Sequence, residues 1–449
     1  MKDAAVFSSM CNSNLVVISL VALAQGVLGL ADLSMSYLYK DDFGMSPAEV
    51  SMAVSLTNIP WIVKPLWGFT SDCFPIFGRR RAPYLIIFGS LAVISWIFMS
   101  VAVSTPFTAI ATMMVIQICN AFCNVIGEAI VVEQGQCTRN ESTYVSLFFG
   151  IRAIGTIVTA YVGGLLIEVI HKRNVFLVTA CFPLLLCGAA AVLREEAAPS
   201  STRVREQVQE IWRFVKQPRI VYPVLFVLFF MSTPSCVDAL FYYFTNELGF
   251  RPEFMGEMRM VWGIGTLLGI YCYNTFLYKY SFKTMILYSS LVAAVVGNSQ
   301  IFLVTGYSRS AGVPDSLFAM TTVFFNQAIG EINIMPILVL SCKLCPKNIE
   351  ASLYALMMST LNLGQLIASQ LGGLLMLALG ITQTEFDHLW ILILLTNVIM
   401  LLPLPFLLLV PNETPTEKEK EEEEETEPLA AGLHIEDSHD LMGLKPKLV

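Results

Sequence analysis

Apolar segments of about 20 residues recur along the whole chain, and they limit its fold more than any other feature. Twelve such segments can be counted, each long enough to cross the hydrocarbon core of a membrane as a helix. They lie at roughly 14–38, 48–70, 83–104, 107–132, 144–168, 174–193, 220–246, 253–277, 284–306, 316–341, 350–378 and 388–410. Because no water inside a bilayer can satisfy backbone groups, these segments must be helices. The sequence therefore predicts an all-α integral membrane protein with 12 transmembrane helices.

Composition excludes a soluble globular protein. Only 14% of the 449 residues are charged, against roughly a quarter in soluble domains. The net charge of −8 comes from the C-terminal segment, because the residues after Pro411 include 12 acidic and 4 basic side chains. The acidic stretch at 417–427 repels itself and cannot form a core. We therefore predict a disordered acidic tail at 411–449.

Basic residues between the apolar segments indicate the orientation. If the N-terminus is cytoplasmic, the cytoplasmic loops hold about 14 Lys and Arg residues and the opposite loops hold 5. Positive charge favours the cytoplasmic side of a membrane. We therefore expect a multi-pass protein with both termini in the cytoplasm. The plasma membrane is the expected location, with an organelle membrane as the alternative.

The chain contains an internal repeat with a spacing of about 205 residues. The motif YLYKDDFGMSP at 37–47 matches YYFTNELGFRP at 242–252, and IGE at 126–128 returns at 329–331. A ladder of small residues also recurs, as Gly155, Thr159 and Gly163, then as Gly364, Ala368 and Gly372. Small residues four apart let two helices approach closely. The repeat predicts two pseudo-symmetric six-helix bundles, at 1–193 and 220–410, joined by a cytoplasmic linker at 194–219.

Several ionisable residues fall inside the apolar segments, where a charge costs at least about 2.5 kcal/mol unless it faces a cavity or a partner. Arg152 and Glu331 lie near the middle of their segments. The other members of the set are Asp32, Lys64, Glu128, Asp238 and Arg259. Two explanations stay open: an internal ion-pair network, such as Glu128 with Arg152, or a water-accessible substrate cavity.

Two local patterns bear on this choice, and the first of them favours the cavity. Polar residues at spacings of three and four form a stripe on the segment at 107–132, and this stripe consists of Gln117, Asn120, Asn124 and Glu128. Lys64 lies between Pro60 and Pro65, which free backbone carbonyls from helical bonding. The ammonium could bond those carbonyls, or it could contact a substrate beside the broken helix.

Longer stretches resemble the folate–biopterin transporter family of the major facilitator superfamily. The similarity rests on IVKPLWGFTSDCFPIFGRRRAPY (62–84), FYYFTNELGFRPEF (241–254), KLCPKNIEASLYALMMS (343–359), and LGITQTEFDHLW with its continuation to LLPLPFLLLVP (379–411). It covers nearly the whole chain except the first dozen residues and the tail. The superfamily loop has Gly-x-x-x-Asp followed by Gly-Arg-Arg. Here Gly78 comes six residues after Asp72, a departure that matches the folate–biopterin branch.

The resemblance implies a major facilitator fold and roles for several residues. It places a conformational lock at Gly68, Asp72, Arg79, Arg80 and Arg81. It also places Lys64, Arg152 and the two acids Asp32 and Asp238 at a central cavity. The expected activity is secondary transport of folates or pterins by alternating access.

The chemistry of folate fits these residue types. Its glutamate tail is anionic, so Arg152, with Lys64 or Arg259, is the expected partner. A carboxylate accepts two hydrogen bonds from the N–H and NH₂ groups of a pterin, which suits Asp32 or Asp238. Asn124 completes the expected substrate-binding set. Acids in an apolar cavity hold protons readily, so Glu128 or Glu331 is the expected proton-coupling group.

Three functional classes are compatible with a chain of this kind to different degrees. A transporter of folates or pterins leads, and a transporter of the same fold for another solute, such as S-adenosylmethionine, is the alternative. A membrane receptor or enzyme is the remote alternative, because no nucleophile, histidine pair or soluble ligand-binding domain is found. The chain has no ATP-binding P-loop. We expect a monomer in the lipid bilayer with no catalytic residue, metal, cofactor or nucleic-acid partner.

Overall fold

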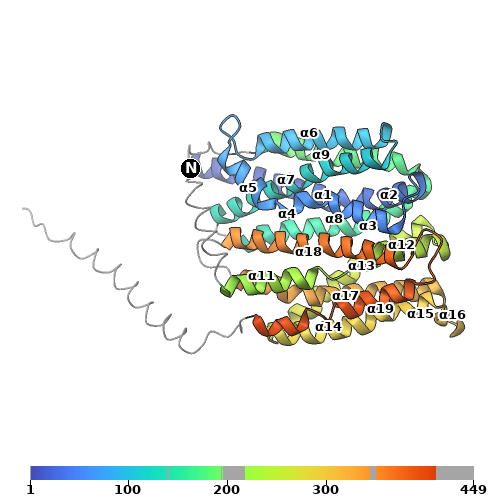
Figure 1. Cartoon of the computed structure of the whole chain (residues 1–449). Helices are drawn as coiled ribbons and strands as arrows, with labels where there is room; N and C mark the ends of the chain where they lie inside the picture. Colours follow the sequence, from blue (N-terminus) through green and yellow to red (C-terminus); the bar gives the residue numbers. More distant parts are fainter. Residues whose placement is uncertain (1, 139–140, 194, 196–217, 344–349, 411–449) are drawn as a thin grey trace, which may run out of the picture.

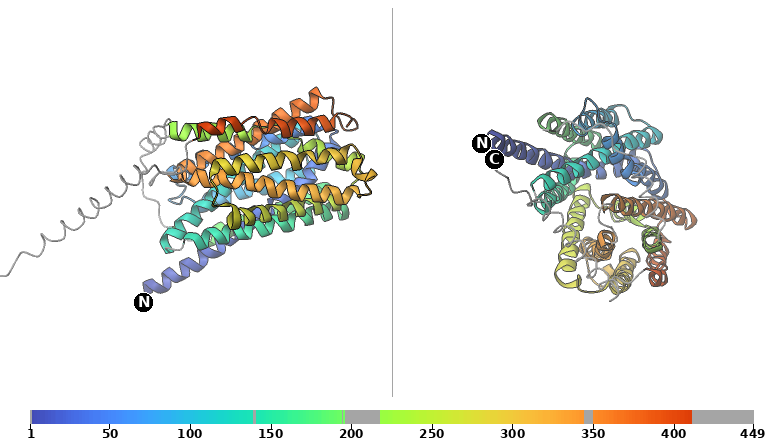
Figure 2. Two further views of the ribbon diagram at one scale, coloured as in Figure 1. Left: turned by 90° about the horizontal axis from the view of Figure 1, so that it is seen from below. Right: turned by 90° about the vertical axis from the view of Figure 1, so that its left-hand side faces the viewer.

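The computed structural model describes residues 2–138, 141–193, 195, 218–343 and 350–410, and these ranges are helical with short turns. The predicted tail, and all of the predicted linker except Glu195 and residues 218–219, lie outside the described residues. Long helices run side by side along one direction, as expected for a membrane protein (Figure 1). Seen from one end, the first and second halves of the chain form two bundles that lie against each other (Figure 2).

The first bundle contains six predicted spans. The first of them is α1 (Lys2–Val27), a 3₁₀ turn (Leu28–Ala31), α2 (Asp32–Tyr37) and a π turn (Leu38–Asp42). The second is broken into α3 (Pro47–Thr57), α4 (Ile59–Ile62) and α5 (Lys64–Cys73). The remaining four are α6 (Ala82–Val101), α7 (Pro106–Thr138), α8 (Glu141–Val169) and α9 (Lys172–Val192).

The second bundle follows the same order. It starts with α11 (Pro218–Met231), α12 (Val237–Tyr242) and a π turn (Tyr243–Glu247), then α13 (Pro252–Cys272) with a π turn (Tyr273–Leu277). It continues with α14 (Phe282–Asn298), α15 (Gln300–Val304), α16 (Tyr307–Ser310) and α17 (Asp315–Lys343). It ends with α18 (Glu350–Ala378), α19 (Leu389–Ile399) and a 3₁₀ turn (Leu404–Leu409).

Nine helices in the described part are long and apolar enough to cross a membrane. The other three predicted spans are also helical, but they do not meet both criteria. They correspond to residues 47–73, to α11 with α12, and to α17. The all-helical membrane fold is therefore confirmed, whereas the count of 12 spans stays a prediction.

The sequence repeat has a direct structural counterpart. In each half the repeated motif forms a π turn, at Leu38–Asp42 and at Tyr243–Glu247. Gly44 and Gly249 follow with φ angles of 61° and 66°, a conformation that glycine adopts without strain. Proline then occupies the first turn of the next helix, at Pro47 and Pro252. The same residues therefore make the same corner in both halves.

The two small-residue ladders pack as predicted. A Cβ added to Gly163 would lie 3.0 Å from the carbonyl oxygen of Leu30, and one added to Gly155 would lie 3.2 Å from Gly26. In the second half, Gly372 contacts the backbone of Ser235 in the same way. Each ladder therefore brings α8 or α18 against the first span of its own half.

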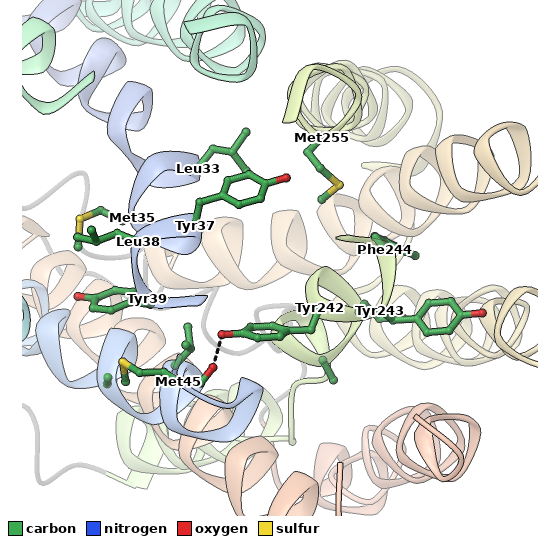
Figure 3. Packing of buried hydrophobic residues seen from close by; sticks show 14 of the residues in the cluster. Leu33, Met35, Tyr37, Leu38, Tyr39, Met45, Tyr242, Tyr243, Phe244 and Met255 are labelled. Carbon is green, nitrogen blue, oxygen red and sulfur yellow. Dashed lines mark hydrogen bonds between the residues drawn. The ribbon is translucent and has the colours of Figure 1, made fainter. Parts of the chain in front are cut away.

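One end of the molecule is closed by contacts between the halves. We call it the sealed end, and it carries the turns at 43–46 and 248–251. A single buried cluster there draws on both halves, with Tyr37 and Leu38 on one side and Met255 and Phe244 on the other (Figure 3). The Tyr242 hydroxyl donates to the carbonyl oxygen of Met45 across the junction at 2.6 Å. This cluster joins the halves as one apolar core.

The opposite end carries the turn at 74–81 and the boundaries at 193 and 218, and we call it the linker end. Two further buried clusters, among the described residues, lie toward this end. One includes Val17, Leu85 and Phe148 of the first half, and the other includes Phe226 and Phe282 of the second half. Neither cluster crosses between the halves, so the hydrophobic junction is concentrated at the sealed end.

Candidate functional site

A cavity of about 530 Å³ lies between the two halves. Its volume is within the range of sites for small organic ligands, about 300–1,000 Å³. The first half contributes side chains with amide, indole and charged groups, among them Gln25, Asp32, Asn58, Trp61, Gln117 and Arg152. The second half contributes Ser235 and one face of α18, which includes Asn362, Gln365 and Ser369. The lining therefore combines many polar groups with apolar ones, in a molecule that exposes many large apolar side chains on its exterior.

Arg152 reaches the cavity because α8 packs closely against α1. A Cβ added to Gly26 would lie only 2.4 Å from the carbonyl oxygen of Arg152, so the two backbones could not approach with any other residue there. The Arg152 side chain makes no direct ion pair or hydrogen bond with the residues that the structure describes, although the Glu128 carboxylate attracts it electrostatically. A guanidinium held in this position offers its donors to whatever fills the cavity.

Lys64 pairs with Glu128 beside the cavity. The ammonium nitrogen lies 3.4 Å from the carboxylate, and the Lys64 side chain is only 15% exposed. The same nitrogen lies 5.2 Å from the ring centroid of Trp61, which lines the cavity. The expected interaction of Glu128 with Arg152 is found as an electrostatic attraction without direct contact, since the direct contact of the carboxylate is with Lys64 from α5.

The proline break in the second span creates a bond between the halves. Pro65 has no N–H to give to the carbonyl of Trp61, so that oxygen is free. Asn362 of α18 donates to it through its amide nitrogen at 3.0 Å. The prediction of a freed carbonyl was correct, but its partner is an amide of the opposite half rather than the Lys64 ammonium.

The predicted polar stripe on α7 divides into three environments. Gln117 and Asn120 line the cavity, and Gln117 accepts from the Trp61 indole at 3.4 Å. Asn124 is fully buried, and neither of its amide atoms has a hydrogen-bond partner among the described residues. Glu128 completes the stripe through its pair with Lys64. The shared helix face is confirmed, although only Gln117 and Asn120 contribute to the described cavity wall.

The two repeated acids each meet the opposite half near the sealed end. Asp32 lines the cavity and lies 3.7 Å from the guanidinium of Arg259 on α13. Asp238 lies beside Ser51 of α3. Neither Asp238 nor Arg259 belongs to the described wall of the cavity. The two acids hold nearly equivalent positions in the sequence repeat, but their partners differ: Asp32 is paired with the Arg259 guanidinium, and Asp238 lies beside the Ser51 hydroxyl.

Glu331 is not brought to the cavity. It packs against α13 where Gly269 leaves room, since a Cβ at Gly269 would lie 2.6 Å from the Cβ of Glu331. Its carboxylate forms no ion pair or hydrogen bond with the described residues, and it is absent from the described cavity wall. The structure therefore separates Glu331 from the group formed by Lys64, Glu128 and Arg152.

The predicted lock residues lie at the linker end. The Arg81 guanidinium contacts the Asp72 carboxylate at 2.8 Å and donates to the Ser71 hydroxyl at 2.7 Å. Gly68 packs against Val125 of α7. Arg79 is exposed, and Arg80 and Arg81 donate backbone N–H groups to the Glu195 carboxylate.

Glu195 was missed by sequence reasoning. Its carboxylate also accepts from the backbone N–H of Ala82, so it caps the first turn of α6. Carboxylates are favourable at a helix N-terminus, where backbone N–H groups have no intrahelical partner. The group formed by Asp72, Arg81 and Glu195 therefore ties the ends of three spans of the first half together.

Several cavity residues were also missed because they are neutral. Asn362, Gln365 and Ser369 follow spacings of three and four on α18, which is a signal that the charge-based search did not use. Trp61 lies in the same proline-broken stretch as Lys64. Within the described part of the chain, no group of three or more His, Cys, Asp or Glu side chains could hold a metal ion.

Comparison with known proteins gives a family match over most of the chain. The model of the BT1 family matches residues 25–430. A folate-biopterin transporter of Synechocystis sp. is 37% identical, over 84% of this chain and 78% of its own length. Folate transporter 2 of Plasmodium falciparum is 32% identical, over 86% of this chain and 85% of its own length.

Solved structures support the fold. A mutant of the nucleoside transporter NupG aligns with a TM-score of 0.70 at 15% identity, covering 89% of this chain and 100% of that one. A D-xylose-proton symporter aligns with a TM-score of 0.68 at 15% identity, covering 90% of this chain and 99% of the symporter. Both are major facilitator transporters. At this identity the similarity concerns the fold alone, and it confirms the expected two-bundle architecture.

Proposed function

This chain belongs to the BT1 family of membrane transporters, and on that premise we propose that it carries folates or pterins by secondary transport. The single observation that supports this substrate class best is the Arg152 guanidinium at the cavity wall, where it makes no direct ion pair with the described residues. Lys64 is balanced by Glu128, so Arg152 supplies one uncompensated positive charge to this group. The anionic tail of a folate is the complementary ligand.

The other candidate ligands of the substrate follow from their positions. Lys64 can reach the tail if Glu128 releases it, and Asn124 can join the site only if α7 shifts, because its side chain is buried. Asp32 can accept from a pterin, although Arg259 competes for it. Asp238 becomes available when the contact with Ser51 opens. The candidate ligands can therefore be ranked by their access to the cavity in this structure, with Arg152 and Asp32 first.

Proton coupling is part of the proposal, with Glu128 as the first candidate and Glu331 as the second. Protonation of Glu128 removes its charge and frees the Lys64 ammonium, which lies 3.4 Å away. Proton binding would therefore strengthen the attraction for an anionic substrate. Glu331 has no such partner in the described part, so its protonation would act only through its packing on α13.

Alternating access would use the two ends of the molecule differently. The sealed end must part to admit or release substrate on one side, while the group of Gly68, Asp72 and Arg79–Arg81 acts as the lock at the other. We propose that the linker end faces the cytoplasm and that the protein works as a monomer, with the plasma membrane as its expected location.

S-adenosylmethionine is the alternative substrate. Asp32 at the cavity wall would suit its sulfonium, but Arg259 already offsets the charge of that carboxylate and Arg152 would repel a cation. Uptake of radiolabelled folate, biopterin and S-adenosylmethionine into proteoliposomes, measured side by side, separates the two. We expect Arg152→Gln to reduce folate uptake at least about 10-fold, since a charge-assisted pair contributes about 1.5–3 kcal/mol. The exposed Arg251→Gln is the matched control and should stay near the wild-type rate.

The substrate assignment fails if S-adenosylmethionine is taken up and folates and pterins are not. Proton coupling is tested separately, by imposing a pH gradient on the same vesicles. Glu128→Gln should abolish the dependence on that gradient while leaving folate binding to the purified protein measurable. Uptake that ignores the gradient, and that survives both Glu128→Gln and Glu331→Gln, contradicts the coupling but not the substrate.

A further inference from the structure

We propose that the two halves of the cavity recognise different ends of the substrate. In this arrangement Arg152 of the first half binds the anionic tail, and Gln365 of α18 binds the oxo edge of the pterin ring. The proposal rests on the function given above and makes it specific. It also assigns the ring to a neutral amide of the second half rather than to the acids Asp32 and Asp238.

Formal charge is divided unequally across the cavity. Both charged residues of the described wall, Asp32 and Arg152, come from the first half. The second half contributes only neutral groups, all of them from Ser235 or from one face of α18. An anionic group is therefore attracted to one side of the cavity, and a neutral polar ring finds hydrogen-bonding groups on the other.

The amides of α18 are not equivalent. Asn362 already donates to the carbonyl oxygen of Trp61 at 3.0 Å, so part of its capacity is used. Gln365 lies one helical turn further on the same face, and its amide makes no hydrogen bond with the residues that the structure describes. A primary amide carries both a donor and an acceptor. Gln365 therefore presents an unused donor and acceptor at the cavity wall.

This pair of groups matches the oxo edge of a pterin. On that edge a ring carbonyl, C4=O, lies next to a ring N3–H, so it displays one acceptor and one donor side by side. The amide N–H of glutamine can donate to the carbonyl while its oxygen accepts from N3–H. A carboxylate cannot donate to C4=O and would repel it. Asp32 is in addition paired with Arg259, which lies 3.7 Å from one of its carboxylate oxygens.

The test combines changes in the protein with changes in the ligand. Binding to the purified full-length protein is measured for folate, for its dimethyl ester with a neutral tail, and for folate methylated at N3. In the wild type, each modification should weaken binding about 10-fold, the effect of losing a charge-assisted pair or two neutral hydrogen bonds. The protein variants are Arg152→Gln and Gln365→Leu. Gln300→Leu, at a buried position away from the cavity, is the matched control.

We expect a crossed pattern. In Arg152→Gln the loss of affinity caused by the ester should fall below about threefold, while the loss caused by N3-methylation remains about 10-fold. In Gln365→Leu the loss caused by N3-methylation should fall below about threefold, while the loss caused by the ester remains about 10-fold. A Gln365→Leu protein that still discriminates the ester is folded. If that variant does not fold, Gln365→Asn, with a shorter amide, should weaken folate and reduce the N3-methylation penalty.

Two failures are distinguishable. If the wild-type protein does not bind folate at all, the proposed function is wrong and this inference falls with it. In the second failure, the wild type binds folate, but each variant changes the ester penalty and the N3-methylation penalty equally, or Arg152→Gln removes the N3-methylation penalty and Gln365→Leu removes the ester penalty. In that case only the division between the halves is wrong. A third outcome would also contradict the division. If Asp32→Asn removes the penalty for N3-methylation and Gln365→Leu leaves that penalty unchanged, the pterin ring is bound by Asp32 and not by Gln365.

Discussion

The two long seams between the halves differ in how they are built. At the first seam α8 meets α13 through glycines, since a Cβ added to Gly256 would lie 2.9 Å from the Cα of Gly164. At the second seam α3 meets α18, and there a Cβ added to Gly373 would meet the flexible side chain of Met52 at 2.9 Å and the backbone oxygen of Ala48 at 3.1 Å. The repeat makes these seams equivalent, because Gly164 and Gly373 hold the same place in the two GGLL motifs.

Hydrogen bonds distinguish the second seam further. Gln370 of α18 donates to the carbonyl oxygen of Met52 at 3.0 Å and to the Ser55 hydroxyl at 2.7 Å. The Ser51 hydroxyl donates to the carbonyl oxygen of Ser369 at 3.1 Å. At the first seam, α8 and α13 are joined in the described residues by an exposed ion pair between Arg251 and Glu168.

The difference suggests separate mechanical roles. A contact between glycine backbones has no side chains to rearrange, so it can pivot but cannot accept added volume. A seam held by side-chain hydrogen bonds can open when those bonds break, each costing about 0.6 kcal/mol on average inside a membrane. We therefore expect α8–α13 to act as the tight pivot and α3–α18 as the seam whose strength sets the closure of the sealed end.

The largest effect is expected from Gly256→Ala, which adds a Cβ against the Gly164 backbone. Overpacking of this kind costs about 1–3 kcal/mol, and we expect uptake to fall at least about 10-fold. Gly373→Ala should be milder, because the Met52 side chain can move aside and the nearest backbone atom, the Ala48 oxygen, lies 3.1 Å away rather than 2.9 Å. Initial uptake rates and thermal unfolding midpoints check both. The control is Gly188→Ala, where an added Cβ meets nothing within 4 Å. Equal losses in the two seam variants would remove the distinction between them.

The next largest effect is expected from Gln370→Leu, which removes two hydrogen bonds from the second seam. At about 0.6 kcal/mol for each bond, the sealed end should open about sevenfold more often. Hydrogen exchange of the α3 backbone amides measures this opening directly. Gln300→Leu should leave exchange in α3 unchanged. Faster exchange confined to α13, with α3 protected, would contradict the role given to the second seam.

A smaller effect is expected from Ser51→Ala, which removes one bond of the same seam. The loss of about 0.6 kcal/mol corresponds to a roughly threefold change in α3 exchange. Ser95→Ala is the control, because its hydroxyl bonds to Leu91 within α6 and not to the other half. If Ser51→Ala opened the seam as much as Gln370→Leu, the contact with Asp238 rather than the bond to Ser369 would dominate at this position.

The sequence predicted the features that depend on local pattern. The packing of the small-residue ladders follows from residue type and spacing, and it is found in the structure. The two repeated motifs were matched in the sequence, and the structure shows that they form the same corner at Gly44 and Gly249. Helix periodicity also placed Gln117 and Glu128 on one face. These inferences succeed because the repeat distance of a helix determines which residues share a side.

Partners between helices could not be predicted in the same way. Spacing shows that Glu128 faces inward, but only the packing of α5 against α7 shows that Lys64 reaches it before Arg152 does. The Trp61 carbonyl was expected to need a donor, yet Asn362 lies about 300 positions away. Gln365 escaped notice because a search for buried charge passes over neutral amides. The pairing of distant residues is set by tertiary packing, which a single sequence does not display.

The smallest effect is expected from Arg251→Ala at the first seam. The Arg251 side chain is 80% exposed and lies 3.8 Å from Glu168, so water and salt screen the pair, and such pairs contribute about 0–1 kcal/mol. If the glycine contact alone determines this seam, Arg251→Ala, Glu168→Ala and the double variant should all transport within about twofold of wild type. A double-mutant cycle on the unfolding midpoints isolates the pair, and its coupling should shrink as salt is raised. A coupling above about 1.5 kcal/mol would mean that charge, and not only backbone packing, holds α8 to α13. The two seams would then differ only in the kind of side-chain bond, an ion pair at the first and hydrogen bonds at the second.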